Sequence, residues 1–479
     1  MKKLSSILKG VNYKGNVDDR IVTGIFYDSR KIKKDSLFIA IKGFNVDGHN
    51  YIDKAIELGA NSVLVDKNID NKYEIPLLTV DNTRKAMSHI ASNFFNDCSK
   101  NIKITGITGT NGKTSVTHLV NHILQFNNHT TSSLGTLGFH SPNGNVSTGF
   151  TTPESLELQN IFKTLYTGGI THLNMEVSSH AIALNRIDDV DIDIAVFTNL
   201  TSEHLDFHGN LDNYFNTKLK LFSRLSSKKI AIINNDDPYA NKIINQTKAK
   251  VLTYGFNDKS DIFPERIKLS LTHSEFYVIY KKNCLKIRTK LIGDFNISNI
   301  LASILVCLSQ GLNINDIVKA INDFDIVPGR VESYKKKNGG IIIIDYAHTP
   351  DAFEKILSLV KKIKPKYKIT TLFGCGGNRD SHKRPLMGLV SEKFSDRVIV
   401  TNDNPRNENP NEIIDQIISG FKSEKYQVIC DRKEAVEQAV KNLKKNQALL
   451  ILGKGIEQHQ IMNDKKIYHS DIKIVKNLL

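Results

Sequence analysis

Short apolar runs alternate with amphipathic stretches along most of the chain. The runs at 102–108, 171–177, 193–200 and 228–234 each hold three to five apolar residues, uninterrupted at 194–197 and 230–233, and longer helix-like stretches separate them. Uninterrupted apolar strands are typical of parallel sheets covered on both faces, and the intervening helices provide the crossovers. The pattern therefore predicts an α/β domain with a doubly wound, parallel sheet.

The pattern differs on either side of this region. Before it, short strands at 24–30 and 62–66 flank an expected helix at 51–60, and a second helix is expected at 83–95. After it, a Pro-Gly breaker at 328–329 precedes a new series of strands at 340–347, 368–374, 397–403, 426–430 and 448–453. We predict a small mixed α/β domain at 1–100, a central domain at 101–327 and a Rossmann-like domain at 328–479.

Composition narrows the class of protein. A length of 479 residues suits about three domains, and no apolar run approaches the roughly 20 residues that cross a bilayer. Five scattered cysteines without metal-ligand spacing indicate a reducing compartment, so we expect a cytoplasmic protein without disulfides. The net charge of +15 suits nucleic acid or anionic nucleotides, but lysines occur along the whole chain, which favours a general lysine-rich composition.

The sharpest local motif is residues 108–114, TGTNGKT, between an expected strand and the helix at 115–125. Glycines let backbone N–H groups converge on phosphate oxygens, the helix N-terminus adds positive potential, Lys113 adds a charge, and Thr114 offers a hydroxyl to Mg²⁺. The motif departs from the general phosphate-loop pattern, because Ile107 stands where that pattern has its first glycine. The alternative is a strand-to-helix turn with a chance lysine, which the placement disfavours.

Further polar residues follow two other strands of the same predicted sheet. Glu176 ends the strand at 171–177, and the stretch 203–208, EHLDFH, follows the strand at 193–200. Taken one at a time, such residues are more often helix caps or polar groups of the core. Together, and in the same domain as a phosphate loop, they predict a metal-assisted phosphoryl-transfer site. The sequence shows no Gly-x-Ser-x-Gly elbow, so we expect activation of a carboxylate by ATP rather than an acyl-enzyme.

These motifs, together with GDFNISN at 293–299, DYAHTP at 345–350, GCGGNRD at 374–380 and DNPR at 403–406, resemble the Mur ligase family in order and spacing over nearly the whole chain. The resemblance implies an ATP-dependent amide ligase of peptidoglycan precursor synthesis. It would add meso-2,6-diaminopimelate to UDP-N-acetylmuramoyl-L-alanyl-D-glutamate through an acyl phosphate, with Mg²⁺ as cofactor. The protein would be a monomer without nucleic-acid partner or membrane insertion.

The resemblance also assigns residues to each ligand. ATP would contact Gly109, Thr110, Asn111, Gly112, Lys113, Thr114, Ser115, Asn296, Asn299, Arg330 and Asp345. The metal would lie on Thr114, Glu176, His204 and a carbamylated Lys218 (N6-carboxylysine), with Lys113, Lys218, Glu176 and His204 as catalytic residues. The UDP-muramoyl dipeptide would contact Ser29, Thr151, Thr152, Ser178 and Arg186, with residues 44–46 near the uridine. The diamino acid would contact Arg379, Asp403, Asn404, Pro405, Arg406, Gly453 and Glu457.

Within this set, Arg406 is the residue expected to discriminate, because an arginine fork pairs with the second carboxylate of diaminopimelate and rejects a bare ammonium. One position departs from the family pattern: Ile456 stands in the sequence Lys454-Gly455-Ile456-Glu457 where this kind of ligase usually has histidine.

Several alternatives stay open at this stage. Within the class, they are a lysine-adding ligase and a folylpolyglutamate synthetase, although the first segment disfavours folate. Outside it, a nucleic-acid-stimulated ATPase would explain both the phosphate loop and the charge. A non-catalytic nucleotide-binding regulator would have no need of Glu176, His204 and Lys218.

Overall fold

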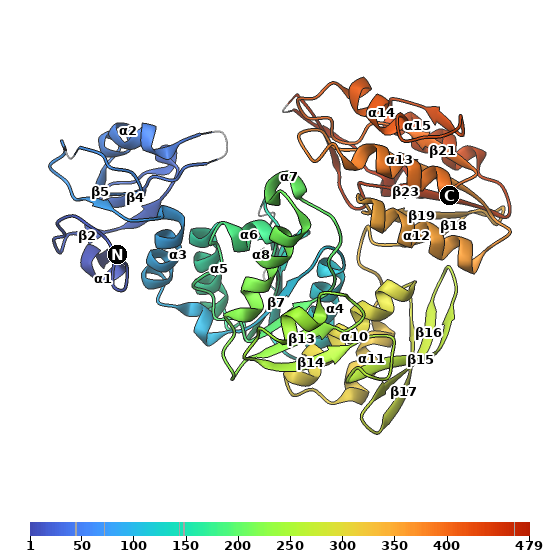
Figure 1. Cartoon of the computed structure of the whole chain (residues 1–479), viewed down its shortest axis with the longest axis horizontal. Coiled ribbons are helices and arrows are strands. Elements are labelled where there is room, and N and C mark those ends of the chain that lie inside the picture. Colours follow the sequence, from blue (N-terminus) through green and yellow to red (C-terminus); the bar gives the residue numbers. More distant parts are fainter. Residues whose placement is uncertain (44–45, 71, 143, 147–148, 464) are drawn as a thin grey trace.

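The computed structural model describes residues 1–43, 46–70, 72–142, 144–146, 149–463 and 465–479. The chain forms three lobes in sequence order, each built around its own sheet (Figure 1). The first lobe, in blue, and the third, in orange and red, lie on opposite sides of the middle lobe, in cyan to yellow (Figure 1).

The first lobe holds a four-stranded parallel sheet. Its strands, in spatial order, are β3 (Gly24–Phe26), β4 (Ser36–Ile39), β5 (Ala60–Val65) and β6 (Leu77–Thr79). Its other elements are β1 (Lys2–Lys3), α1 (Leu4–Ile7), β2 (Ile21–Val22), η1 (Ser29–Lys31), η2 (Gly48–Tyr51), α2 (Ile52–Glu57), α3 (Thr83–Phe94) and η3 (Cys98–Asn101). The strand expected at 24–30 ends early, because the Asp28 carboxylate accepts the Arg30 N–H and turns the chain into η1.

The middle lobe holds an eleven-stranded sheet in the order β10-β9-β8-β11-β7-β12-β13-β14-β15-β16-β17. Its strands are β7 (Lys103–Thr108), β8 (Thr131–Gly135), β9 (Gly138–Ser141), β10 (Gly144–Val146), β11 (His172–Glu176), β12 (Ile194–Phe197), β13 (Ile230–Asn234), β14 (Lys250–Tyr254), β15 (Ile262–Leu269), β16 (Ser274–Tyr280) and β17 (Asn283–Thr289). The run from β8 to β14 is parallel, as predicted for β7, β11, β12 and β13, whereas the strands β8 and β14 themselves were not predicted. Antiparallel extensions at both ends, β10-β9-β8 and β15-β16-β17, were not predicted.

Helices cover both faces of the parallel strands, which makes the lobe doubly wound. On one face, α4 (Lys113–Phe126), α10 (Asp294–Ser309) and α11 (Ile314–Asp323) share a core with the antiparallel extension β15 to β17. The opposite face carries α5 (Ser155–Thr167), α6 (Ser179–Ala183), α8 (Leu211–Ser223) and α9 (Ala240–Ile244), with α7 (Leu205–His208) nearby.

The third lobe holds a six-stranded sheet that is parallel except for its first strand. The spatial order is β18 (Glu332–Lys335), β19 (Ile341–Asp345), β23 (Gln447–Leu452), β20 (Lys368–Phe373), β21 (Arg397–Val400) and β22 (Tyr426–Val428). Its helices are α12 (Pro350–Ile363), α13 (Lys383–Phe394), α14 (Pro410–Ile418), α15 (Arg432–Asn442) and α16 (Asp471–Leu478), and β24 (His459–Met462) pairs with β25 (Lys465–Tyr468). The Rossmann-like prediction is therefore right in its parallel core.

The carboxyl ends of the strands in the middle and third lobes face a common space. Residues directly after β7, β11, β19, β20, β21 and β23 all line one cleft. Side chains far apart in the sequence meet there because parallel strands end at one edge of a sheet. Within the part of the chain that the structure describes, no helix is long and apolar enough to cross a membrane.

Candidate functional site

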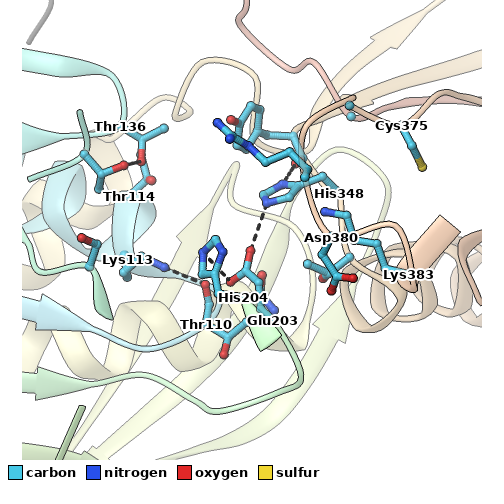
Figure 2. A pocket seen from close by; sticks show the side chains of 18 of the residues that line it. Thr110, Lys113, Thr114, Thr136, Glu203, His204, His348, Cys375, Asp380 and Lys383 are labelled. Atoms are coloured by element: carbon cyan, nitrogen blue, oxygen red, sulfur yellow. Dashed lines mark hydrogen bonds and ion pairs between the residues drawn. The ribbon is translucent and has the colours of Figure 1, made fainter. Parts of the chain in front are cut away.

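Two adjoining cavities lie between the middle and third lobes. The first, of about 340 Å³, is the cleft at the strand ends, and the second, of about 850 Å³, lies between α10 and α12. Both are lined by Asn111 and Gly112 of the phosphate loop and by Arg330, Tyr346 and His348. Figure 2 shows Lys113 and His204 from the middle lobe facing Asp380 and Lys383 from the third lobe across the cleft.

The phosphate loop is held in a shape that needs glycine at two positions. Gly109 and Gly112 have φ of 145° and 88°. A Cβ atom would lie 1.9 Å from Thr198 Oγ1 at Gly109 and 2.4 Å from Asn299 Oδ1 at Gly112. Gly112 is the N-cap of α4, so the free N–H groups of the first helical turn are directed into the cleft. This arrangement suits a phosphate group.

Lys113 and Thr114 begin α4 with different partners. The Lys113 ammonium donates to the carbonyls of Gly109 at 2.9 Å and Thr110 at 2.7 Å, so it folds over the loop. The Thr114 hydroxyl donates to Glu176 Oε1 at 2.9 Å and accepts from Arg330 Nη2 at 3.1 Å. Arg330 therefore links the start of the third lobe directly to the phosphate loop.

Glu176 ends β11 and is buried, with 1% of its surface exposed. Besides Thr114, the Thr136 backbone N–H and hydroxyl donate to its carboxylate at 2.9 and 3.1 Å. A Cβ atom at Gly135 would lie 2.2 Å from Glu176 Oε1, so only glycine fits beside this carboxylate. These contacts fix both oxygens at the edge of the cleft.

Lys218 is buried, and no carboxylate among the residues that the structure describes lies within hydrogen-bond distance of its ammonium. Its ammonium is 3.1 Å from the Gly109 carbonyl and 4.5 Å from the centre of the Tyr214 ring. Burial, reinforced by the charge of Lys113, lowers the pKa of Lys218 well below its ordinary value. The lowered pKa favours the neutral amine over the ammonium.

His204 and Glu203 follow β12 on the floor of the cleft. His204 has a positive φ of 57°, and burial lowers its pKa to about 4, so its imidazole is neutral at neutral pH and can act as a ligand. Burial alone would raise the pKa of Glu203, but the hydrogen bond from His348 and nearby positive charges hold it below its ordinary value. The His348 contact, at 3.2 Å, crosses from the third lobe to the middle lobe (Figure 2). Glu203 belongs to the stretch 203–208 that the sequence singled out, although it was given no role of its own, and His348 was not predicted as a site residue.

The second cavity contains the remaining residues that the sequence assigns to a nucleotide. Asn296 and Asn299 lie on the first turns of α10, where Asn296 Nδ2 donates to the Ile292 carbonyl at 2.8 Å. Ser115 and Asp345 also line this cavity. Burial raises the pKa of Asp345, whose carboxylate accepts the N–H groups of Val331 at 2.7 Å and Ala347 at 2.6 Å. The cavity also exposes wall residues that the sequence did not single out: Asp236, Asp237, Phe256, Phe295, Lys355 and Leu359.

The third lobe contributes a polar wall to the cleft. Its lining includes six of the seven residues predicted to contact a diamino acid: Arg379, Asp403, Asn404, Arg406, Gly453 and Glu457. The seventh, Pro405, is buried behind the wall. Arg406 has a φ of 53° and donates to the Gly377 carbonyl at 2.6 Å, which directs its guanidinium along the wall.

Lys454 was missed by sequence reasoning although it anchors this wall. It is fully buried, and its ammonium donates to Asn404 Oδ1 at 3.0 Å and Glu457 Oε2 at 2.9 Å. Asn404 Nδ2 also donates to Glu457 Oε2, at 2.8 Å. Burial would raise the pKa of Glu457, but the Lys454 charge lowers it. Ile456 contacts a separate cavity of about 80 Å³ that Leu137 also lines.

The residues assigned to a muramoyl dipeptide are divided between several places. Thr151 and Ser178 line the cleft, whereas the Thr152 hydroxyl lies behind it and donates to the Glu176 carbonyl at 2.9 Å. Arg186 does not reach the cavity, because its guanidinium pairs with Glu154 at 2.8 Å and donates to the Thr152 carbonyl at 2.9 Å. Ser29 lies in η1 of the first lobe, outside both cavities, and Phe44 and Asn45 lie outside the described residues.

The predicted magnesium site has an unusual set of ligands, because two of the four are a threonine hydroxyl and a carbamylated lysine. Within the described ranges, no three His, Cys, Asp or Glu side chains are grouped as a metal site. Of the four predicted ligands, only Glu176 and His204 belong to those residue types. Thr114 and Lys218 also line the cleft. A carboxylate, a hydroxyl and a carbamate oxygen would provide the hard oxygen ligands that Mg²⁺ prefers, so the residues present fit the ion.

Comparison with known proteins gives consistent matches over all three lobes. Residues 21–95 match the model of the Mur ligase family catalytic domain, residues 107–307 the Mur ligase middle domain, and residues 329–455 the Mur ligase glutamate ligase domain. Two relatives named UDP-N-acetylmuramoyl-L-alanyl-D-glutamate–2,6-diaminopimelate ligase are similar over full length. The protein of Caldanaerobacter subterraneus is 43% identical over 100% of this chain and 99% of its own, and that of Clostridioides difficile is 39% identical over 99% of each.

Solved structures of Mur ligases share the fold of this chain. A structure of a ligase of that same name has a TM-score of 0.71 at 27% identity, covering 100% of this chain and 99% of its own. A MurF ligase from Thermotoga maritima in complex with ADP, 18% identical, shares the fold with a TM-score of 0.65, covering 95% of this chain and 96% of its own. Sequence and structure comparisons thus agree over the full length, and the chain belongs to the Mur ligase family of ATP-dependent ligases.

Proposed function

We propose that the protein joins meso-2,6-diaminopimelate to the D-glutamate of UDP-N-acetylmuramoyl-L-alanyl-D-glutamate, with ATP as the energy source. The observation that carries this proposal is the composition of one cleft. Lys113 of the phosphate loop lines one side, and Asn404, Arg406 and Glu457 line the other. A phosphoryl donor and an amine bound on these two sides would meet at the same carboxylate.

ATP is assigned to both cavities. Its phosphates would lie on the loop from Gly109 to Ser115, and its base in the larger cavity beside Asn296 and Asn299. Arg330 and Asp345 would complete the nucleotide site from the third lobe. We infer that the lobes at 1–100, 101–327 and 328–479 bind the UDP moiety, ATP and the diamino acid, respectively.

Magnesium would be held by Thr114, Glu176, His204 and Lys218, and would offset negative charge on the phosphoryl group during transfer. Support for a carbamylated Lys218 comes from its burial and lowered pKa, because only the neutral amine captures CO₂. The carbamate would replace a buried cation beside Lys113 with an anion. That change removes a like-charge contact and adds an oxygen ligand.

The reaction we propose has two steps. The D-glutamate γ-carboxylate attacks the γ-phosphorus of ATP, which forms an acyl phosphate and releases ADP. The amine of the diamino acid then attacks the acyl carbon, which forms the amide and releases phosphate. Closure of the third lobe over the middle lobe would exclude water from the acyl phosphate, and the contact of Arg330 with Thr114 already links the two lobes.

Selection of diaminopimelate is assigned to the polar wall. Arg406 is half-buried and presents a guanidinium that would pair with the distal carboxylate. Glu457 would accept the distal ammonium, although Lys454 already neutralises part of its charge. Ile456 does not line the cleft with Arg406 and Glu457, but it shares the cavity of about 80 Å³ with Glu457. The names of the full-length relatives support the same amino acid.

The test is phosphate release from ATP with the UDP-linked muramoyl dipeptide and either meso-diaminopimelate or L-lysine. Release that depends on diaminopimelate would support both the reaction and the role of Arg406. Release with lysine alone would keep the ligase and overturn the assigned amino acid. Release with neither would remove the proposed reaction, and stimulation by DNA would instead indicate a nucleic-acid-dependent ATPase.

A further inference from the structure

The lysines of the third lobe are concentrated at one edge of its sheet. The strands β19, β20, β21 and β23 run parallel, and the residues after their carboxyl ends line the cleft. The segments at their amino ends, with the one before β22, are 335–340, 364–368, 395–397, 421–425 and 441–447. Strands of four to six residues separate the two edges by roughly 13–20 Å.

These five segments have an unusual composition. They contain eleven lysines and one arginine against two acidic residues, Asp396 and Glu424. Their net charge of +10 makes up two thirds of the net charge of +15 of the whole chain. The fold therefore gathers at one edge a charge that looks dispersed in the sequence.

Contacts in the structure bring the segments side by side. Lys336 Nζ donates to the carbonyls of Val440 at 2.7 Å and Lys441 at 3.1 Å, and Asn338 Nδ2 donates to that of Leu443. The Lys368 N–H donates to the Asn446 carbonyl at 3.2 Å. Three lysine-rich segments thus form one continuous surface.

Most of this charge is free to meet a partner. Nine of the eleven lysines are exposed: Lys335, Lys337, Lys366, Lys368, Lys422, Lys425, Lys441, Lys444 and Lys445. Asp396 accepts a hydrogen bond from the Ile369 N–H at 2.8 Å. Among the described residues, the ion pair that these segments form joins Lys441 to Glu437 at 3.8 Å. A surface of this kind attracts an anionic partner.

We propose that this lysine-rich edge docks the protein onto an anionic phospholipid surface. The basic groups are almost all lysines, whose compact charges on flexible stems suit a diffuse layer of headgroups. The aromatic residues of the segments, Tyr367 and Phe421, pack against the core, so they do not offer a stacking platform for bases. None of the lysines lines a cavity described above, as expected of a flat contact.

Docking at this edge leaves the reaction cleft open. The cleft lies at the carboxyl ends of the same strands, so a bound membrane and a bound substrate would occupy opposite edges of the sheet. The contact is peripheral and electrostatic, and it requires no apolar insertion.

The test compares two variants of the full chain with matched loss of charge. The edge variant carries glutamine in place of Lys335, Lys337, Lys366, Lys444 and Lys445, which leaves Lys336 and its hydrogen bonds intact. The control variant carries glutamine in place of Lys248, Lys250, Lys259, Lys268 and Lys282, all exposed on the middle lobe. Both are sedimented with vesicles of equal parts phosphatidylglycerol and phosphatidylcholine, and with pure phosphatidylcholine vesicles.

We expect the unmodified protein and the control variant to bind the anionic vesicles at low salt, and to be released at about 0.5 M salt. Since each lysine near such a surface changes binding roughly fivefold, replacing five of them should weaken the binding of the edge variant on the order of a thousandfold. Phosphate release should be equal in all three proteins. Absence of binding by the unmodified protein, or equal binding by the edge variant, would overturn the proposal. Tighter binding of duplex DNA than of vesicles at the same salt would also overturn it.

Discussion

The most direct test of the third lobe is replacement of Arg432 by methionine. Arg432 and Asp471 are both fully buried, and the guanidinium donates to the Asp471 carboxylate at 2.8 and 3.1 Å. The same guanidinium donates to the Leu452 carbonyl at 3.0 Å, so it ties α15 and α16 to the end of β23. Removing Arg432 leaves the buried Asp471 carboxylate without its cation, with the hydrogen bond from His469 at 2.7 Å retained, and breaking a buried ion pair in this way costs about 3–5 kcal/mol. That loss is a large part of the roughly 5–15 kcal/mol that stabilises a domain.

Acidic pH should reduce the difference in stability between the unmodified protein and the Arg432→Met variant. Burial alone would raise the pKa of Asp471, but the charge of Arg432 and the hydrogen bond from His469 hold it below its ordinary value. A carboxyl with a lowered pKa contributes stability that is complete above its unfolded pKa of about 3.9, and this contribution is lost as pH falls through the folded pKa. The Arg432→Met penalty should therefore be constant from neutral pH to about pH 5 and shrink below about pH 4.

The assay is hydrogen exchange of peptides covering β23 and α16, because the chain has no tryptophan and three lobes need not unfold in one transition. The double variant Arg432→Met with Asp471→Leu is the control, and it should recover most of the loss because it removes both charges. A loss below about 1 kcal/mol in the single variant, or an equal loss in the double variant, would refute this account of the pair.

Three further predictions concern the cleft. Lys218→Ala should lower the rate of phosphate release by about 100-fold or more without lowering the melting temperature, because it removes a buried amine from the reacting centre; retained activity would exclude Lys218 from the site. Arg406→Lys should raise the KM for diaminopimelate about tenfold or more and leave the ATP affinity unchanged, since lysine cannot form a bidentate contact with the distal carboxylate. An unchanged KM would contradict that contact. Arg330→Met should weaken ATP binding about tenfold, because the hydrogen bond to Thr114 and the stacking on Tyr346 are lost. Calorimetry measures this affinity, and an affinity equal to that of the unmodified protein would show that Arg330 does not contribute to ATP binding.

Much of the site was predictable from local sequence. A parallel sheet places the residue after each strand at one edge, so the loop around Lys113, Glu176 after β11 and His204 after β12 meet wherever the strands are correctly identified. The strand β12 was easy to identify from its uninterrupted apolar run, and β7 and β11 from apolar residues that mostly alternate with polar ones. The antiparallel extensions β15 to β17 were missed because their exposed positions interrupt the apolar pattern.

Partners of buried charges were not predictable, since they come from distant parts of the chain. Lys454 resembles any lysine in the sequence, but it is fully buried and paired with Asn404, 50 positions away. Glu203 meets His348 across 145 positions. Arg186 was expected to bind substrate, yet the structure pairs it with Glu154. Its assignment to the dipeptide stays a prediction.

The sequence by itself therefore determined the order of the elements, the phosphate loop and the residue types at the strand ends. These depend on periodicity and short-range geometry, which act over a few residues. Only the tertiary structure decided which amines are desolvated, which carboxylates are already paired and where the lysines gather. Desolvation and charge pairing depend on distances in space, and folding brings together residues whose separation along the chain carries no record of that proximity.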